Sequence, residues 1–220
     1  MLSNSEICKM KLLVVASTFT EIEPFVTANQ HVNHLITGVG VPATLFGLMH
    51  YLQNNQADLI IQAGICGSFS IQQFPIGKVV QVISDCFADL GAIEQHQIKT
   101  IFELGFANAN KLPYAAGLLK NNSSDSSWNF VDAARGITIN TISDQLGNAA
   151  LYQKKFNADV ESMEGAALHY VCNMMGIRYC QLRSVSNAVG NRNKTDWNIP
   201  LAITNLNTSL NEVVRRELAL

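Results

Sequence analysis

The chain has 220 residues, of which 48% are hydrophobic and 15% are charged. This composition is typical of one globular domain with a large apolar core, and it excludes a chain that is disordered throughout. The 15 lysines and arginines nearly balance the 17 aspartates and glutamates, which gives a net charge of −2. A chain this close to neutral offers no basic surface for nucleic acid or for an anionic membrane.

The first residues predict a short tail before the folded domain. Residues 1–9 are expected to form a ragged N-terminal tail and residues 10–220 a single domain, with Met10 as a candidate natural start. No apolar stretch near the start is long enough for a membrane span or a signal peptide, so a cytoplasmic protein is expected. The five cysteines are scattered and form no CxxC pair, which predicts small buried thiols rather than disulfides or a zinc site.

In the first half of the chain, apolar β-branched runs alternate with segments of helical periodicity. Helical spacing of apolar residues predicts helices over 21–29 and 42–52. The apolar runs predict strands at 12–16, 34–39, 58–63 and 78–84, the first of them covered on both faces. Glycine turns are expected at 38–40 and 64–67, where the second and third strands end.

The second half begins with less regular sequence. Residues 89–114 mix glycine and aromatic residues with weak helix signals, and the polar residues 120–129 predict an exposed loop. Beyond them, strands are expected at 136–140, 159–161 and 178–186, and helices over 144–156, over 163–175 and from 197–200 to 217. The alternation of strands and helices predicts a layered α/β domain around a largely parallel sheet.

Two motifs have the spacing of known ligand sites but lack their context. Gly38-x-Gly40-x-x-Ala43 matches a dinucleotide fingerprint, yet it follows the second strand, and Asp58 precedes the next strand instead of ending it. A tight turn before a helix is therefore expected there. His169 and Cys172 lie at i, i+3 on one predicted helix and are too few for a metal site, so we expect them to pack in the core or at an interface.

Polar residues and glycines follow the ends of several predicted strands, where open α/β sheets bind ligands. The segments are STFTEIE at 17–23, QAGICG at 62–67, VESMEGAA at 160–167 and RSVSNAVG at 183–190. Together they resemble the nucleoside phosphorylase and nucleosidase superfamily, from Lys11 to nearly the end of the chain. VESMEGAA and RSVSNAVGNRN, with Trp197 and Pro200 after them, are most similar to the futalosine hydrolases. The resemblance implies a three-layer α/β/α sandwich with a central mixed, largely parallel and partly barrel-like sheet.

The resemblance also implies roles for individual residues. Glu21 matches the glutamate that activates water, and Asn187 stands where adenine-specific relatives have an aspartate that protonates the purine N7. Glu164 matches the glutamate that holds the ribose hydroxyls, and Met163 the methionine beneath the sugar. The other residues expected to bind substrate are Cys66, Gly67, Ile142, Ser162 and Ser186.

Each of these residues also has a simpler explanation. Glu21 is placed to cap its helix, Glu164 to be an acid at a helix start and Asn187 to be a turn residue. Their occurrence together, in this order and spacing, favours function.

Arginines complete the expectation for the site. Arg183 is expected to order the two glutamates, and Arg192 to meet a carboxylate on the substrate's benzoate group, unless either forms a surface or interface ion pair. Phosphorylases of the superfamily hold phosphate with arginines in the segments that correspond to 17–23 and 62–69, and neither segment here contains one. Water is therefore the expected nucleophile.

The resemblance implies a purine nucleosidase that hydrolyses futalosine, releasing hypoxanthine and dehypoxanthine futalosine for menaquinone synthesis, without a metal or organic cofactor. An amide cannot donate a formal proton, but it can donate a hydrogen bond to O6 of a departing 6-oxopurine. The alternatives are a methylthioadenosine/S-adenosylhomocysteine nucleosidase, an aminofutalosine hydrolase or a catalytically silent nucleoside-binding protein. The expected partners are a purine nucleoside and water, with no nucleic acid or membrane. A homodimer or larger homo-oligomer is expected, with a neighbouring site completed by Phe102, Phe106 or Tyr114.

Overall fold

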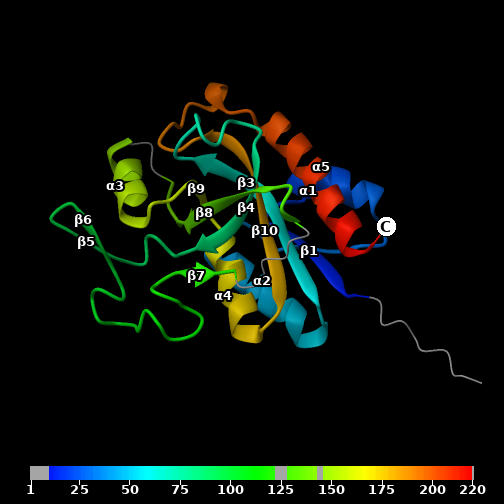
Figure 1. Cartoon of the computed structure of the whole chain (residues 1–220), viewed down its shortest axis with the longest axis horizontal. Coiled ribbons are helices and arrows are strands. Elements are labelled where there is room, and N and C mark those ends of the chain that lie inside the picture. Colours follow the sequence, from blue (N-terminus) through cyan, green and yellow to red (C-terminus); the bar gives the residue numbers. More distant parts are fainter. Residues whose placement is uncertain (1–9, 122–127, 143–145, 220) are drawn as a thin grey trace, which may run out of the picture.

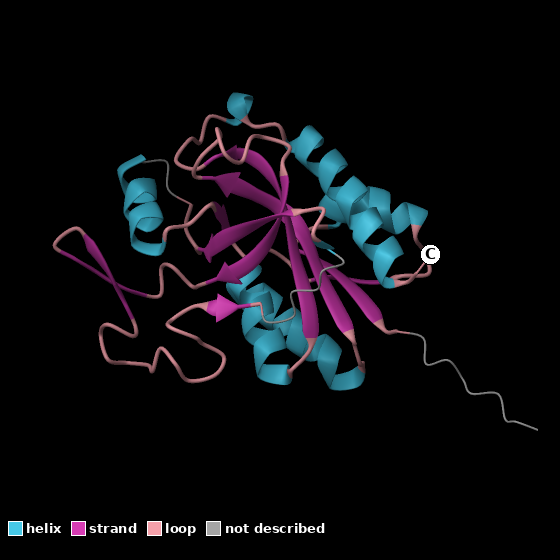
Figure 2. Ribbon diagram, in the orientation of Figure 1, coloured by secondary structure: helices cyan, strands magenta, loops and turns pink. Residues whose placement is uncertain are grey.

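The computed structural model describes residues 10–121, 128–142 and 146–219 of the chain. Within these residues, eight strands form one mixed sheet, a ninth and a tenth form a separate hairpin, and helices cover the main sheet (Figures 1 and 2). The strands of the main sheet are β1 (Leu12–Ala16), β2 (Asn33–Ile36), β3 (Leu59–Ser68), β4 (Val79–Asp85), β7 (Leu119–Lys120), β8 (Asp132–Thr138), β9 (Val160–Ser162) and β10 (Arg178–Ala188). The helices are α1 (Phe19–Ala28), α2 (Val41–Asn54), α3 (Leu146–Phe156), α4 (Gly165–Met175) and α5 (Ile199–Glu217).

The main sheet curls back on itself. Its strands follow the order β10-β4-β8-β9-β3-β1-β2, with β7 on β4, and β10 also pairs with β3. This extra pairing closes β10, β4, β8, β9 and β3 into a ring, while β1 and β2 extend from it as an open sheet. Five of the pairings are parallel and three are antiparallel, so the expected mixed and largely parallel sheet is present.

Different helices cover the two faces of this sheet. On one face, Val14 and Ile61 belong to an apolar cluster with Phe25 of α1 and Leu206 of α5. On the other face, the strand residues Leu13, Ile60 and Tyr179 form a second apolar cluster. They pack there against Leu48 of α2 and Leu168 of α4. Burial on both faces explains why the strands read as continuous apolar runs rather than as an alternating pattern.

Local sequence signals set the ends of the longest helix. The side chain of Asn198, at the N-cap of α5, accepts a hydrogen bond from the backbone N–H of Leu201, and Pro200 lies in the first turn. Arg215 and Arg216 lie in the last turn, where positive charge complements the helix dipole. Leu206 and Leu210 of α5 pack in the apolar cluster of the sheet and place the helix against β3 and β10.

Most predicted elements are present with small shifts of their ends, but two predictions are wrong. Residues 64–67 do not form a turn, because β3 runs through them and pairs with β10 as far as Ala188. The region 89–114, for which no element was predicted, holds a hairpin of β5 (Gly91–Glu94) and β6 (Gln97–Thr100). Within the predicted exposed loop 120–129, Trp128 is fully buried, and residues 122–127 lie outside the described residues.

Smaller expectations also have an outcome. The cysteines of the described residues, Cys66, Cys86, Cys172 and Cys180, are free and buried, as expected, and Cys8 lies outside that part of the chain together with the predicted tail 1–9. His169 and Cys172 pack in the core, and burial lowers the pKa of His169 to about 4. No helix in the described ranges is long and apolar enough to cross a membrane.

Candidate active site

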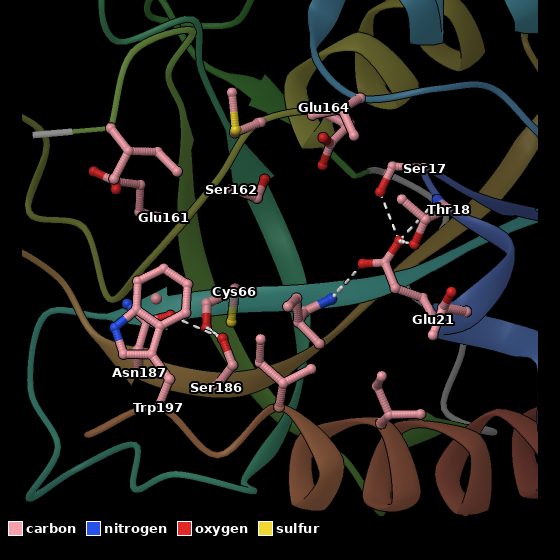
Figure 3. Close-up of a pocket in the computed structure, with 18 residues that line it drawn as sticks. Ser17, Thr18, Glu21, Cys66, Glu161, Ser162, Glu164, Ser186, Asn187 and Trp197 are labelled. Atoms are coloured by element: carbon pink, nitrogen blue, oxygen red, sulfur yellow. Dashed lines mark hydrogen bonds between the residues drawn. The ribbon is translucent and has the colours of Figure 1, made fainter. Parts of the chain in front are cut away.

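A cavity of about 300 Å³ opens where the carboxyl ends of β1, β3 and β10 meet β9 (Figure 3). This is the end of the sheet at which α/β folds bind ligands, and the volume is at the lower end of the range for small-molecule pockets. The nine residues expected to be catalytic or to bind substrate all lie in its wall. The two arginines that were also expected at the site, Arg183 and Arg192, do not line it. The lining residues are Ser17, Thr18, Thr20, Glu21, Val39, Ile65, Cys66, Gly67, Ile142, Glu161, Ser162, Met163, Glu164, Ser186, Asn187, Trp197, Ile199 and Ile203.

The carboxyl group of Glu21 is held by four donors. Its Oε2 accepts hydrogen bonds from the Ser17 hydroxyl (2.6 Å) and from the backbone N–H and hydroxyl of Thr18 (3.0 Å each). Its Oε1 accepts one from the backbone N–H of Ile65 on β3 (3.0 Å). Thr18 is the N-cap of α1, so helix capping explains the backbone bond from Thr18 but not the bond from Ile65. Glu21 therefore caps its helix and is also fixed in the cavity wall.

Glu164 lies at the start of α4 and is also buried. Its Oε1 accepts a hydrogen bond from the backbone N–H of Gly40 (3.1 Å), and its Oε2 lies 3.5 Å from Nη1 of Arg183. Gly40 has a φ of 90°, a conformation that favours glycine, so the turn after β2 brings its N–H to this carboxyl group. The Gly38–Gly40 segment is thus a tight turn before α2, as expected, and it contacts the candidate site.

Arg183 lies behind the cavity wall and is 1% exposed. Its Nη2 donates to the side-chain carbonyl of Gln62 (3.0 Å), and its Nη1 faces the backbone carbonyl of Ile65 and Oε2 of Glu164 (3.5 Å each). A side chain at Gly64 would overlap Nη1 of Arg183 and lie 3.0 Å from Oε1 of Glu21. The guanidinium group therefore contacts Glu164 and lies near Gly64, beside which Glu21 also lies. Its role in ordering the two glutamates stays a prediction.

Replacing Gly64 by alanine is expected to lower kcat of any reaction that depends on Glu21 and Glu164 by about 100-fold, the scale of a small displacement of reacting groups. The added methyl group pushes Arg183 or Glu21 out of position. Steady-state kinetics and thermal unfolding of the variant measure the effect. Gly176→Ala is the control, because Gly176 has a φ of 66° and no neighbour within 4 Å of an added Cβ, so it costs stability far from the cavity. Equal kcat values for the two variants would contradict the argument.

The opposite end of the cavity carries an oriented amide. Asn187 Oδ1 accepts a hydrogen bond from the Ser186 hydroxyl (2.8 Å), and its Nδ2 donates to the backbone carbonyl of Ala188 (2.9 Å). One N–H and one lone pair of the amide remain for a ligand. Cys66 is a neighbour of this end, and burial raises the pKa of its thiol to about 12, so it stays neutral.

The wall at this end is largely apolar. Trp197 lies there, and its indole N–H donates to the backbone carbonyl of Asn191 (2.9 Å). Ile142, Ile199 and Ile203 add further apolar surface to the cavity wall. Arg192 is exposed and does not line the cavity, but its guanidinium carbon lies 5.4 Å from the centroid of the Trp197 ring. Arg192 is thus placed at the rim, one side chain away from the cavity.

Sequence reasoning missed several lining residues. Glu161 is the middle residue of the three-residue strand β9 and directly precedes the SMEG segment, a signal that was available. Ser17, Thr18 and Thr20 lie in the segment that marked the end of the first strand. Nothing in the local pattern pointed to Ile199 and Ile203, because only the packing of α5 beside the cavity brings them there.

Comparisons with known proteins show the family of the chain. The family model described as the phosphorylase superfamily matches residues 20–216. The futalosine hydrolase of Thermus thermophilus is 28% identical over 84% of this chain and 80% of its own length, and that of Streptomyces coelicolor 30% identical over 74% and 67%.

Solved structures show the same fold at low sequence identity. The 5'-methylthioadenosine/S-adenosylhomocysteine nucleosidase of Helicobacter pylori superposes with a TM-score of 0.78 at 13% identity, covering 97% of this chain and 100% of its own. The native futalosine hydrolase of the same organism gives 0.76 at 14% identity, covering 94% and 97%. The chain therefore belongs to the phosphorylase superfamily, in which the curated relatives that it matches are futalosine hydrolases.

Proposed function

We propose that the protein is a purine nucleosidase that hydrolyses the N-glycosidic bond of futalosine and releases hypoxanthine and dehypoxanthine futalosine. The observation that carries the proposal is the arrangement of the cavity, with two buried glutamates at one end and an oriented amide at the other. The names of the curated relatives supply the substrate, since three of them are futalosine hydrolases.

The two glutamates fit the sugar end of such a reaction. Water adds to C1′ of the ribose while the C1′–N9 bond breaks, and the bonding electron pair leaves with the purine. Glu21 takes a proton from the water, a contribution typically worth about 10²–10⁴-fold in rate. Glu164 binds the ribose hydroxyls and stabilises the positive charge of the oxocarbenium-like transition state.

Asn187 fits the purine end. The departing hypoxanthine anion carries part of its negative charge on O6, where the free N–H of the amide can donate a hydrogen bond. The anion then takes a proton from water at N7, and Oδ1 accepts a hydrogen bond from the resulting N7–H. Because the Ser186 hydroxyl holds Oδ1, the amide is oriented before substrate binds. Adenine lacks O6 and depends more on a true acid, so an asparagine here favours a 6-oxopurine.

Water rather than phosphate fits the remaining space. Among the described residues that line the cavity, none is lysine or arginine, and the only arginine beneath it already faces Gln62 and Glu164. Phosphate binding by a phosphorylase relies on such cationic donors. The nucleophile of the proposed reaction is therefore water.

Purine release from futalosine, inosine, aminofutalosine and methylthioadenosine, each with and without phosphate, tests the proposal. We expect hypoxanthine from futalosine, at a rate that phosphate does not change. Release that requires phosphate would make the protein a phosphorylase. Adenine release as the faster reaction would make it an aminopurine nucleosidase and would remove Asn187 from the specificity argument.

Replacing Asn187 by aspartate is expected to shift the ratio of kcat/KM values from 6-oxopurine towards 6-aminopurine nucleosides by about 10-fold or more. A carboxyl group can protonate N7 of adenine, and it repels the O6 charge of hypoxanthine. Parallel assays with futalosine and aminofutalosine measure the ratio. Asn191→Asp serves as the control, because Asn191 is near Trp197 but outside the cavity wall. An unchanged ratio in Asn187→Asp would contradict the assignment.

Arg192 completes the proposed substrate site at its rim. Its guanidinium group lies over Trp197, and no ion pair of Arg192 occurs within the described residues. A carboxylate on the 5′ side of futalosine fits such a free guanidinium group. Loss of this contact in Arg192→Gln should raise KM for futalosine and leave KM for inosine unchanged.

We further propose that residues 10–220 form one three-layer α/β/α domain that acts as a homo-oligomer in the cytoplasm. Helix clusters on opposite faces of the sheet support the layering. Exposed apolar side chains on and before α2 support association, with Val39 56% and Phe46 73% exposed. Phe102, Phe106 and Tyr114 remain predicted contributors to a neighbouring site, and Phe106 is 79% exposed.

A further inference from the structure

Glu161 is a buried carboxyl group in the cavity wall that the proposed reaction leaves unused. Its side chain lines the cavity, and the residue is only 9% exposed. Its carboxyl group has no hydrogen-bond or ion-pair partner among the described residues. Burying a carboxyl group without a partner costs free energy. A ligand that supplies a donor at this position would remove that cost.

The register of the sheet places Glu161 opposite Asn187. Gly67 of β3 pairs with Glu161 of β9 on one side and with Asn187 of β10 on the other. Adjacent strands lie about 4.8 Å apart, so the two backbones flank Gly67 at a separation of about 10 Å. Figure 3 shows Glu161 at the same end of the cavity as Asn187 and Trp197, away from Ser17 and Glu21. The two polar side chains thus border the same part of the cavity, on either side of Gly67.

A purine in this space presents different edges to the two side chains. With O6 and N7 on Asn187, the neighbouring N1 is the next polar atom of the ring. A 6-oxopurine carries a hydrogen on N1, whereas adenine has a lone pair there. An ionised carboxyl group only accepts hydrogen bonds, so it binds the first and repels the second. Polar groups of this kind discriminate strongly, because the wrong ligand leaves them unpaired.

We propose that Glu161 selects 6-oxopurines by accepting a hydrogen bond from N1–H, while Asn187 contacts O6 and N7. The inference rests on the proposed function, since it takes a purine as the group bound at this end of the cavity. It adds a specificity-determining residue on a strand that the catalytic groups do not use.

The titration of Glu161 fits this role. Burial, with a smaller contribution from Asp89, raises the pKa of Glu161 to about 7. The other titratable groups around it are Cys66 on β3 and Tyr152 on α3, both with pKa values raised by burial. Because the deprotonated form accepts the N1–H, hypoxanthine should bind more tightly as the pH rises through about 7.

Calorimetric titration of the full chain with hypoxanthine and with adenine tests the proposal without requiring turnover. The variants are Glu161→Gln, which keeps the shape and adds a donor, and Glu161→Leu, which removes the acceptor. Glu94→Gln is the matched control, because Glu94 is exposed on the β5–β6 hairpin. We expect the wild type to prefer hypoxanthine, and Glu161→Gln to lower the hypoxanthine-to-adenine affinity ratio by about 10-fold or more. Glu161→Leu should weaken hypoxanthine more than adenine, and both should lose the pH dependence.

The outcomes separate this inference from the proposed function. Equal losses for the two bases, or an unchanged ratio and pH dependence, would overturn the role of Glu161 as a selector. Futalosine cleavage by the wild type tests the proposed function by itself. A protein that leaves futalosine intact but prefers hypoxanthine through Glu161 would disprove the reaction and support the inference.

Discussion

Replacing Glu21 by glutamine is expected to lower kcat for futalosine hydrolysis by about 10²–10⁴-fold while the nucleoside still binds. Glutamine has nearly the same shape but cannot take a proton from water. Both carboxyl oxygens of Glu21 accept a backbone N–H, from Thr18 and from Ile65. Either orientation of the amide therefore faces one of these donors with its own N–H₂ group. We expect this conflict to lower the free energy of unfolding by about 1–3 kcal/mol.

Single-turnover hydrolysis and calorimetric binding of futalosine measure the two halves of this expectation. Glu23→Gln provides the matched control, since Glu23 is exposed two residues further along α1 and does not line the cavity. It should keep wild-type kcat. If Glu21→Gln retained activity within a few-fold, or Glu23→Gln lost as much, the base would not be Glu21.

The sequence predicts best where burial alone decides the structure. In β1, successive residues such as Leu13 and Val14 pack into different apolar clusters on the two faces of the sheet. A continuous apolar run is the direct consequence of that double burial, so the strand is visible without tertiary information. The same reasoning located the polar segment that follows β1, because chain direction in a parallel sheet places it at the ligand-binding end.

Prediction fails where contacts distant in sequence override local signals. Gly64 and Gly67 lie where a turn was expected, but they are strand residues paired with Arg183 and Asn187, some 120 positions further on. Their lack of side chains serves close packing, since a Cβ at Gly67 would come within 2.9 Å of Val189. Trp128 similarly follows a polar stretch but is fully buried, in the cluster that α1 and α5 form with the sheet. The composition of a short sequence segment indicates neither the pairing of β3 with β10 nor the burial of Trp128.

Some residues of the candidate site could be predicted from local sequence, and others could not. Glu21, Glu164 and Asn187 were found because each follows or ends a strand in a recognisable segment. Recognising Glu161 as a site residue instead depends on knowing which strand borders β3, and that strand, β9, has only three residues. The order of strands in a closed ring is a property of the whole fold. The neighbours of Glu161 in space are therefore not evident from the sequence.

Replacing Arg183 by methionine is expected to affect stability and catalysis together. The guanidinium group is 1% exposed and faces Glu164, so removing it leaves a buried carboxyl group without its counter-charge. Breaking a buried ion pair in this way typically costs about 3–5 kcal/mol. Arg183→Lys keeps the charge but cannot reach Gln62, Ile65 and Glu164 with one planar group. We expect that variant to remain folded while kcat falls by about 100-fold, the effect of misplaced catalytic groups.

The comparison of kcat with KM decides whether Arg183 positions the glutamates or only supports the fold. Misplacement of Glu21 and Glu164 should lower kcat of Arg183→Lys far more than it raises KM, because the purine end of the cavity is unaltered. Arg178→Met is the control on the same strand, since Arg178 pairs with Glu217 at 2.8 Å, away from the cavity. It should lose stability and keep kcat per folded molecule. If Arg183→Lys behaved like this control, Arg183 would be a structural ion pair, and the geometry of the two glutamates would have to come from their backbone donors alone.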